Sequence, residues 1–329
     1  MDERIDARLN WLNDMCTLYA YGKQLYDSSA QALEAEPGSE MIVSSANLGD
    51  TVYIATFSKA YKEVHGVNNL VICAKKRQAN AVEWFEGVDG IVGLTDEEML
   101  CLRYYITISR KFNSNHIRYG HVPCYIDWDY PGTFFHIPPG FEGLPLIKAW
   151  EQRVLELPDN SPKCDIIVPD NIEIPQENIE VLKNAVLIAP ASFTVKGIPV
   201  QFWEKLTVAL KENGFFVFCN SGGLPYDTII DGSKELVLST KDLILHAPLF
   251  KHIISIRSGL TDLVSKTNAK LTVLHTGEAR DSLYIEYGTI GDDVRDLGRM
   301  QGIYPMFYDE EREDELIRLI VEDAGRQIE

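Results

Sequence analysis

Short apolar runs alternate with segments of helical periodicity in the first half of the chain. An apolar run at 41–45 is followed by a polar turn, by helical spacing over 51–64 and by a second apolar run at 70–73. A short apolar run bounded by turns indicates a buried strand, and its alternation with amphipathic helices indicates βαβ units. The first half is therefore predicted to form a parallel sheet covered by helices.

The second half shows the same alternation more regularly. Turn residues and helical spacing predict helices at 200–212 and 240–247, with Thr240 as the N-cap of the latter. Apolar runs predict strands at 185–189, 215–219, 236–238, 252–256 and 271–274. We therefore expect an α/β protein with two Rossmann-like domains, each built on a parallel sheet.

Less regular segments set the predicted boundaries. Helical spacing over 4–35 predicts one or two leading helices, and 309–328 reads as an acidic amphipathic helix. Residues 110–145 are basic at first and then rich in aromatics, Gly and Pro, which predicts a long loop. Four prolines between 158 and 175 indicate a connector. The expected division is an N-terminal domain at 1–155, a linker at 156–183, a C-terminal domain at 184–308 and a terminal helix at 309–329.

Charge and composition narrow the classes of partner. The 329 residues carry a formal charge of −18, which argues against nucleic acid as a partner because polyanions need a basic surface. No apolar run is long enough to span a membrane, and the charged amino terminus lacks a signal core. Six scattered cysteines without a C-x-x-C pair are typical of a reducing compartment. We expect a cytoplasmic protein with at most peripheral membrane contact.

The turn Arg257-Ser258-Gly259-Leu260-Thr261-Asp262 follows a predicted strand and opens a predicted helix. Gly259 lets the backbone approach a ligand, and free N–H groups at a helix start attract anions. An arginine at a buried edge needs an anionic partner, which is either a bound phosphate or Asp262 itself. The turn is thus a candidate phosphate site, with a structural Arg–Asp pair and a plain helix cap as the alternatives.

Motifs of other nucleotide and catalytic sites are missing from the sequence. No G-x-G-x-x-G follows a predicted strand, and there is no G-x-x-x-x-G-K-[ST]. The histidines and cysteines form no cluster with zinc-ligand spacing, and no G-x-S-x-G elbow is present. NAD enzymes, P-loop NTPases and triad hydrolases are therefore disfavoured, and no metal is expected.

Three turns resemble those of glycosyltransferase family 9, the ADP-heptose:lipopolysaccharide heptosyltransferases. They are Asn47-Leu48-Gly49-Asp50-Thr51-Val52, Ile188 to Lys196 with its Pro-Ala-Ser, and the 257–262 turn. The likeness spans most of 40–275, with two departures: Arg257 replaces the family's acidic residue, and Asp262 replaces its histidine. The resemblance implies a GT-B fold, in which two Rossmann-like domains face a central cleft.

The resemblance also implies a reaction. A sugar would pass from a nucleotide-diphosphate donor to a glycan or lipid-linked saccharide acceptor, with inversion and without a metal or other cofactor, in bacterial surface polysaccharide synthesis. Asp50 would be the catalytic base, with helix capping as its alternative role. The donor's phosphates would meet residues of three predicted turns, namely Ser192, Lys196, Ser221, Gly222, Arg257, Ser258, Gly259 and Asp262.

The sites for the nucleotide of the donor and for the acceptor are assigned to two further segments. Thr240 and Asp242 begin the helix that commonly holds the nucleotide in this fold, although capping explains them equally well. The basic start of the 110–145 segment would complement an acidic or phosphorylated acceptor. The candidate acceptor residues are Asn47, Arg110, Lys111, His116 and Arg118. Two other functions stay open: a nucleotide-sugar epimerase of the same fold, and a nonenzymatic binding protein.

Overall fold

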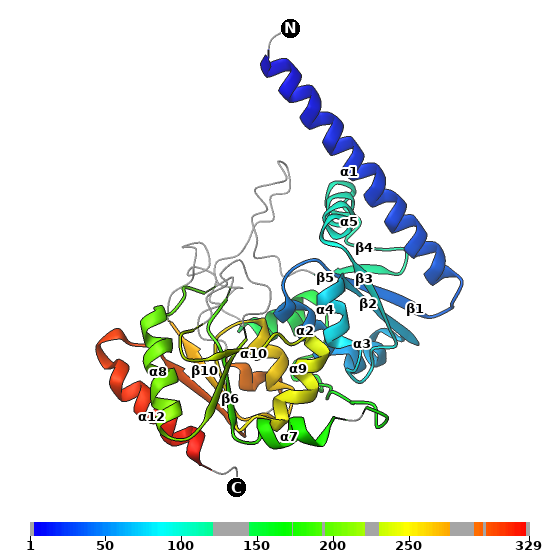
Figure 1. Ribbon diagram of the computed structural model, residues 1–329. Coiled ribbons are helices and arrows are strands. Elements are labelled where there is room, and N and C mark those ends of the chain that lie inside the picture. The colour runs from blue at the N-terminus through cyan, green and yellow to red at the C-terminus, as the bar shows by residue number, and fades with distance from the viewer. Residues whose placement is uncertain are drawn as a thin grey trace. The chain divides into compact units, whose positions relative to one another are not determined.

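The computed structural model describes residues 3–120, 145–172, 174–192, 195–220, 230–276, 293–298 and 301–326. These residues form two compact units, shown in Figure 1. Unit 1 comprises 3–120 and 150–164, and unit 2 comprises 145–149 and the described residues from 165 onward. The first unit therefore ends at Cys164, within the segment that the prolines suggested as a linker, and that segment also contains helix α7 (Gln176–Leu182).

Unit 1 is built on a five-stranded sheet in the order β3-β2-β1-β5-β4. Four strands are parallel: β1 (Ser39–Ser44), β2 (Asn69–Lys75), β3 (Gly90–Leu94) and β5 (Ile117–Gly120). The short β4 (Asn113–Ser114) runs antiparallel to β5. The helices are α1 (Glu3–Glu34), α2 (Leu48–Thr56), α3 (Ser58–His65), α4 (Lys76–Val82) and α5 (Asp96–Ser109).

The hydrophobic pattern explains which helices cover this sheet. Tyr26 of α1 and Leu102 of α5 pack with Met41 and Val43 of β1, so these two helices cover one face. The single helix expected over 51–64 is divided into α2 and α3 at Phe57, which is fully buried. Part of the expected loop after 110 is a β-hairpin, since Asn115 and His116 both have positive φ, as a two-residue hairpin turn requires.

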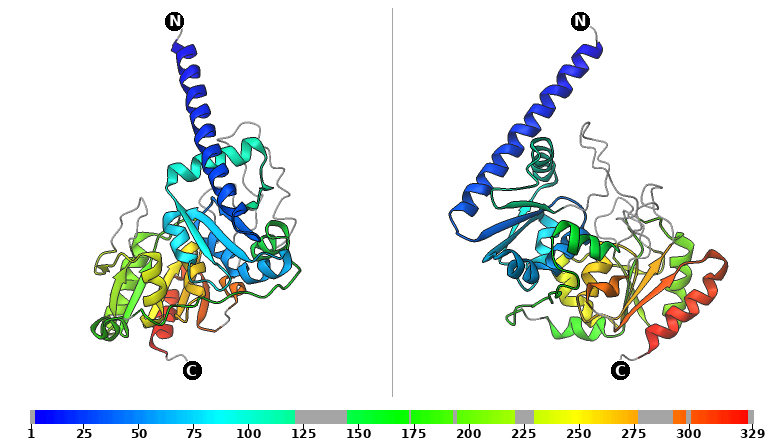
Figure 2. Two further views of the ribbon diagram at one scale, coloured as in Figure 1. Left: turned by 90° about the vertical axis from the view of Figure 1, so that its right-hand side faces the viewer. Right: turned by 180° about the vertical axis from the view of Figure 1, so that it is seen from behind.

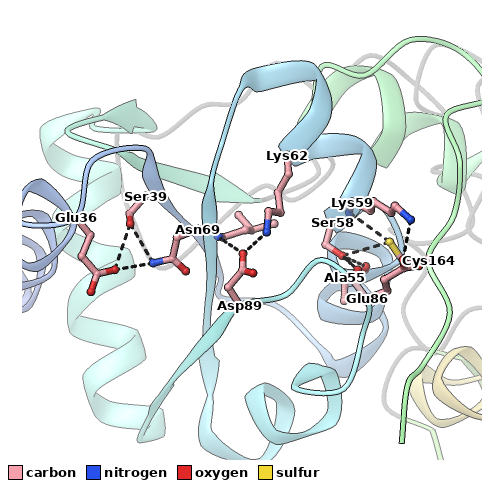
Figure 3. A network of polar contacts seen from close by, with 11 residues as sticks. Glu36, Ser39, Ala55, Ser58, Lys59, Lys62, Asn69, Glu86, Asp89 and Cys164 are labelled. Carbon is pink, nitrogen blue, oxygen red and sulfur yellow. Dashed lines mark hydrogen bonds and ion pairs between the residues drawn. The ribbon is translucent and has the colours of Figure 1, made fainter.

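Polar contacts fix the connecting segments of unit 1 (Figure 3). Cys164 donates its backbone N–H to Thr56 O at 2.7 Å, and its Sγ lies 3.3 Å from the backbone nitrogen of Lys59. Ser58 Oγ donates to Glu86 O at 2.6 Å. These bonds attach the segment that ends at Cys164 to the start of α3, which explains why it belongs to unit 1.

Unit 2 has six parallel strands in the order β11-β10-β9-β6-β7-β8. They are β6 (Ala185–Ala189), β7 (Phe216–Cys219), β8 (Lys234–Glu235), β9 (His252–Ile256), β10 (Leu271–His275) and β11 (Ile303–Phe307). The chain winds outward from β6 in one direction and from β9 in the other, which is the doubly wound arrangement. With two largely parallel sheets, the expected α/β fold class is confirmed.

Two long helices cover one face of this sheet. α8 (Val200–Glu212) and α12 (Glu313–Gly325) pack together there, with Phe202 and Ile320 in a core shared with β6 and β9. The remaining helices of unit 2 include α9 (Thr240–His246) and α10 (Gly259–Ser265). Short helical turns complete the described chain: α6 (Leu146–Lys148), η2 (Ala149–Val154), η3 (Ala247–Leu249), η4 (Val294–Leu297) and η5 (Glu310–Arg312).

Candidate functional site

The switch point of unit 2 lies between β6 and β9. These strands are adjacent, with Ala189 in register with Ser255, and Ser255 Oγ donates to Ala189 O at 3.3 Å. The turns that follow them therefore leave the sheet at the same carboxyl edge. In open α/β sheets, ligands bind outside this edge at the point where the winding reverses. Sequence reasoning placed Ser192 and Arg257 on these two turns, and the topology brings the turns together.

Arg257 and Asp262 form an ion pair within their turn. Arg257 Nη1 lies 2.9 Å from Asp262 Oδ1 and donates to Ser258 O at 3.0 Å. The side chains are 11% and 3% exposed. Burial raises the pKa of Asp262, while Arg257 acts in the opposite direction. The intramolecular pair is thus observed, and because a guanidinium is a rigid fork, this contact fixes the direction of the arginine.

Ser258 has a different role from the one expected. It is the N-cap of α10, and its backbone N–H, predicted as a phosphate donor, instead donates to Thr261 Oγ1 at 3.1 Å. The helix-cap interpretation is therefore the observed one. Gly259 is the first residue of α10 and is partly exposed at the same edge.

The turn after β6 carries a hydroxyl and a cation. Ser192 Oγ is buried and makes no hydrogen bond within the described residues, whereas Lys196 is exposed on the segment that leads to α8. A buried hydroxyl without a partner is costly, so this oxygen is suited to a ligand or a water molecule. The predicted donor residues Ser221 and Gly222 lie outside the described residues.

The start of α9 differs in detail from its prediction. Ser239, rather than Thr240, is the N-cap: its Oγ accepts from Asp242 N at 3.1 Å and lies 2.7 Å from Asp242 Oδ2. The expected strand at 236–238 is also wrong, because β8 ends at Glu235. Capping therefore accounts for the Asp242 side chain, and Thr240 is the first residue of the helix.

His275 is a residue of this edge that sequence reasoning missed. It ends β10, whose Leu274 O accepts from Arg257 N at 2.9 Å, so it lies beside the Arg257 turn. Burial, together with the nearby charge of Arg257, lowers its pKa to about 4, so the imidazole is neutral at pH 7. The signal in the sequence was a titratable residue directly after an apolar strand.

In unit 1, the Asn47 turn follows the carboxyl end of β1. Asp50 accepts a hydrogen bond from Asn47 N at 2.9 Å as part of a capping box, and its side chain is partly exposed. Hydroxyls support this edge: Ser44 Oγ lies 2.8 Å from Thr51 Oγ1, and Ser45 Oγ lies 2.6 Å from the hydroxyl of Tyr119 on β5. The capping alternative for Asp50 is therefore the observed contact.

The predicted acceptor residues do not form one group. Arg118 is 8% exposed and pairs with Glu156 at 3.2 Å and Glu40 at 3.7 Å. Glu40 lies near the start of β1, so the guanidinium is directed toward the amino edge, away from Asp50. His116 is exposed in the hairpin turn at that same edge. The assignment of Arg118 to an acceptor loop is therefore wrong, because the residue is part of a buried structural network.

Arg110 and Lys111 lie toward the other edge. Phe112 O accepts from Tyr119 N at 2.7 Å, and the antiparallel direction then carries the preceding residues toward the carboxyl edge. Arg110 is the exposed C-cap of α5, and Lys111 Nζ lies 5.1 Å from the centre of the Tyr26 ring. These two cations and Tyr119 are thus better placed near the Asp50 turn than Arg118 and His116 are.

Among the described residues, no group of three or more His, Cys, Asp or Glu side chains could hold a metal ion. The helices of the described segments include none with the length and apolar content needed to cross a membrane.

Comparisons with known proteins place the fold. No family model and no curated protein matches the chain. Among solved structures, E. coli heptosyltransferase WaaC with ADP aligns at 11% identity and a TM-score of 0.55, covering 87% of this chain and 99% of that chain. E. coli ADP-heptose lipopolysaccharide heptosyltransferase II aligns at 9% identity and a TM-score of 0.56, covering 87% of this chain and 98% of that chain.

A glycosyltransferase family 9 protein from Veillonella parvula DSM 2008 aligns at 8% identity and a TM-score of 0.53, covering 86% of this chain and 88% of that chain. The chain therefore has the fold of the family 9 heptosyltransferases over most of its length. The resemblance inferred from three short turns is confirmed at the level of the fold.

Proposed function

We propose that this protein is a glycosyltransferase that moves a sugar from a nucleotide-diphosphate donor to a saccharide acceptor. The observation that carries the proposal is the carboxyl edge of unit 2 at the switch point, where Arg257 is held by Asp262. This geometry suits a diphosphate, because an arginine fork matches phosphate oxygens and the switch point is where this topology binds ligands. The shared fold with heptosyltransferases supports it.

The donor half of the reaction needs positive charge on the departing diphosphate. Arg257 would supply a fixed charge and Lys196 a mobile one, while Ser192 would donate its hydroxyl. Charge from the protein replaces the Lewis acid that many transferases use, so the reaction is proposed to be independent of metal. His275 would stand beside the diphosphate as a neutral hydrogen-bonding group, because its lowered pKa keeps it uncharged.

The acceptor half needs a base for the attacking hydroxyl. We assign this role to Asp50, whose hydrogen bond from Asn47 N fixes the orientation of its carboxylate. A single displacement by the activated hydroxyl inverts the configuration at the transferred carbon. Arg110 and Lys111 favour an acidic or phosphorylated acceptor, as in bacterial surface polysaccharides.

The role of Asp50 as the catalytic base is tested by the substitution Asp50→Asn. An asparagine oxygen can still accept from Asn47 N, so the cap is kept while the ability to take a proton is lost. We expect turnover with donor and acceptor to fall at least about a hundredfold, since general base catalysis contributes that much, with nucleotide affinity nearly unchanged. Asp96→Asn, in the first turn of α5, is the matched control and should retain full turnover.

Unchanged turnover in Asp50→Asn would remove Asp50 from the mechanism. The same assay without acceptor distinguishes the transferase from the epimerase alternative. Conversion of the donor sugar without an acceptor would be evidence for the epimerase.

A further inference from the structure

Helix α1 carries two different environments along its length. Its second half packs on unit 1, where Tyr26, Ala30 and Leu33 are buried. At Gly22 the helix touches α5, and a Cβ at this position would lie 2.0 Å from Cys101 O. Figures 1 and 2 show the first half continuing beyond α5, away from the sheet of unit 1.

One apolar seam runs through both halves. Trp11, Met15, Leu18, Gly22 and Leu25 follow each other at alternating spacings of four and three residues, which places them on one side of the helix. The seam contacts α5 at Gly22 and then extends past it. Trp11 at its far end is 49% exposed. The part of the chain that the structure describes therefore covers only one end of the seam.

An uncovered seam of this kind needs a partner. A helical segment of about a dozen residues is marginal in water unless packing supports it, and an exposed tryptophan on such a segment is a strong anchor for an interface. A membrane surface is a poor match: between residues 3 and 20 the acidic Glu3, Asp6 and Asp14 outnumber the basic Arg4 and Arg8.

We propose that a second copy of this chain covers the seam, with two α1 helices pairing antiparallel around a two-fold axis at Trp11. Arg8 and Asp14 each lie three residues from Trp11, on opposite sides of it. In an antiparallel pair centred there, position 8 of one copy lies opposite Asp14 of the partner subunit, and the reverse contact forms as well. The segment is therefore complementary to itself in charge around Trp11, as a two-fold interface requires.

The oligomeric mass of the full-length protein tests this pairing. The wild type should sediment as a dimer at micromolar concentration, and Trp11→Ala should raise the dimer dissociation constant at least about tenfold. Asp14→Arg and Arg8→Asp should each weaken the dimer, and the two together should restore it. Trp11 is exposed and remote from the sheet, so an unchanged thermal unfolding curve verifies that unit 1 stays folded.

Cross-linking tests the register. In a Cys16→Ser background, Trp11→Cys should be joined across the two-fold axis by a short bis-maleimide, whereas Asn13→Cys, on the far side of the helix, should not. A monomeric wild type, equal linking at both positions, or a dimer that persists undiminished in Trp11→Ala would each overturn the proposal. Recruitment of monomers to lipid vesicles or to a different protein would do the same.

Discussion

Two buried acid–base pairs lie at opposite edges of the unit 2 sheet. At the carboxyl edge, Arg257 and Asp262 are five residues apart in one turn, and Arg257 keeps 11% exposure. At the amino edge, Lys270 precedes β10 and pairs with Asp323 of α12 at 3.7 Å, with both side chains under 5% exposed. The first pair leaves part of a cation accessible at the ligand edge, whereas the second joins distant segments. Position and exposure thus separate a candidate site from an internal anchor.

The amino-edge pair is part of a larger buried polar network. Lys270 Nζ donates to the carbonyls of Asp323 and Arg326 near the end of α12. His252 Nε2 lies 3.9 Å from Asp323 Oδ2 and 2.8 Å from Thr272 Oγ1. Burial raises the pKa of Asp323 and lowers the pKa of Lys270, and each partner opposes that shift in the other. The network attaches the C-terminal helix to the sheet.

Breaking the amino-edge pair should have the largest effect on stability. Lys270→Met keeps the volume but leaves Asp323 buried without its cation, so the free energy of unfolding should fall by about 3–5 kcal/mol in urea titrations. Lys205→Met is the matched control, because the exposed Lys205 of α8 pairs with Glu313 of α12 and its loss should cost below about 1 kcal/mol. Equal losses in the two variants would contradict the anchor role.

The pH dependence of stability should come next in size. Burial lowers the pKa of His252 to about 3, so between pH 6.5 and 3 the unfolded chain binds a proton that the folded chain does not. Stability from this group is complete above pH 6.5 and is lost as the pH falls; between pH 7 and 5 the loss is about 2 kcal/mol. The raised pKa of Asp323 acts in the opposite sense, adding stability as pH falls through its folded value.

Urea unfolding at pH 7, 6 and 5 measures how the free energy of unfolding depends on pH. His252→Gln should remove about half of this dependence, because the lowered pKa of His275 contributes a comparable share. His116→Asn, which removes an exposed imidazole from unit 1, should leave it unchanged. A pH dependence that is undiminished in His252→Gln would contradict the contribution of His252.

Replacing the acid of the carboxyl-edge pair should cost least. Asp262→Asn keeps the shape, and since burial already raises the pKa of Asp262, removing its charge should lower the free energy of unfolding by only about 1–2 kcal/mol. Nucleotide affinity should weaken in parallel, because Asp262 holds the arginine fork in place. Calorimetric titration measures this effect; undiminished affinity would mean that the pair does not position the ligand.

Much of the fold was readable from the sequence where apolar runs are cleanly bounded. β6, β9 and α8 have the predicted bounds, since buried parallel strands are continuous apolar runs and α8 ends at Asn213-Gly214. β3 was missed because two glycines interrupt it. β11 was missed because it contains Pro305, which is tolerated there since the strand lies at the edge of the sheet.

The candidate site was only partly readable. The Arg257 turn was found because a glycine-containing polar turn after an apolar strand is a local pattern. Its partner Asp262 stayed one of two alternatives, since pairing depends on side-chain directions. Arg118 was misassigned because it follows a largely basic and polar segment at 110–116, whereas its neighbours in space are Glu40 and Glu156. Such contacts between distant segments leave no trace in local spacing.

Calorimetric titration with a panel of nucleoside diphosphates tests the central claim most directly. The account predicts that at least one of them binds the wild type, that Arg257→Lys weakens binding through loss of the fork, and that Arg257→Ala weakens it by about tenfold or more. Arg318→Ala, an exposed arginine of α12 paired with Glu322, should bind as the wild type does. Failure of every nucleoside diphosphate to bind, or full affinity in Arg257→Ala, would contradict the assignment of this edge as the donor site.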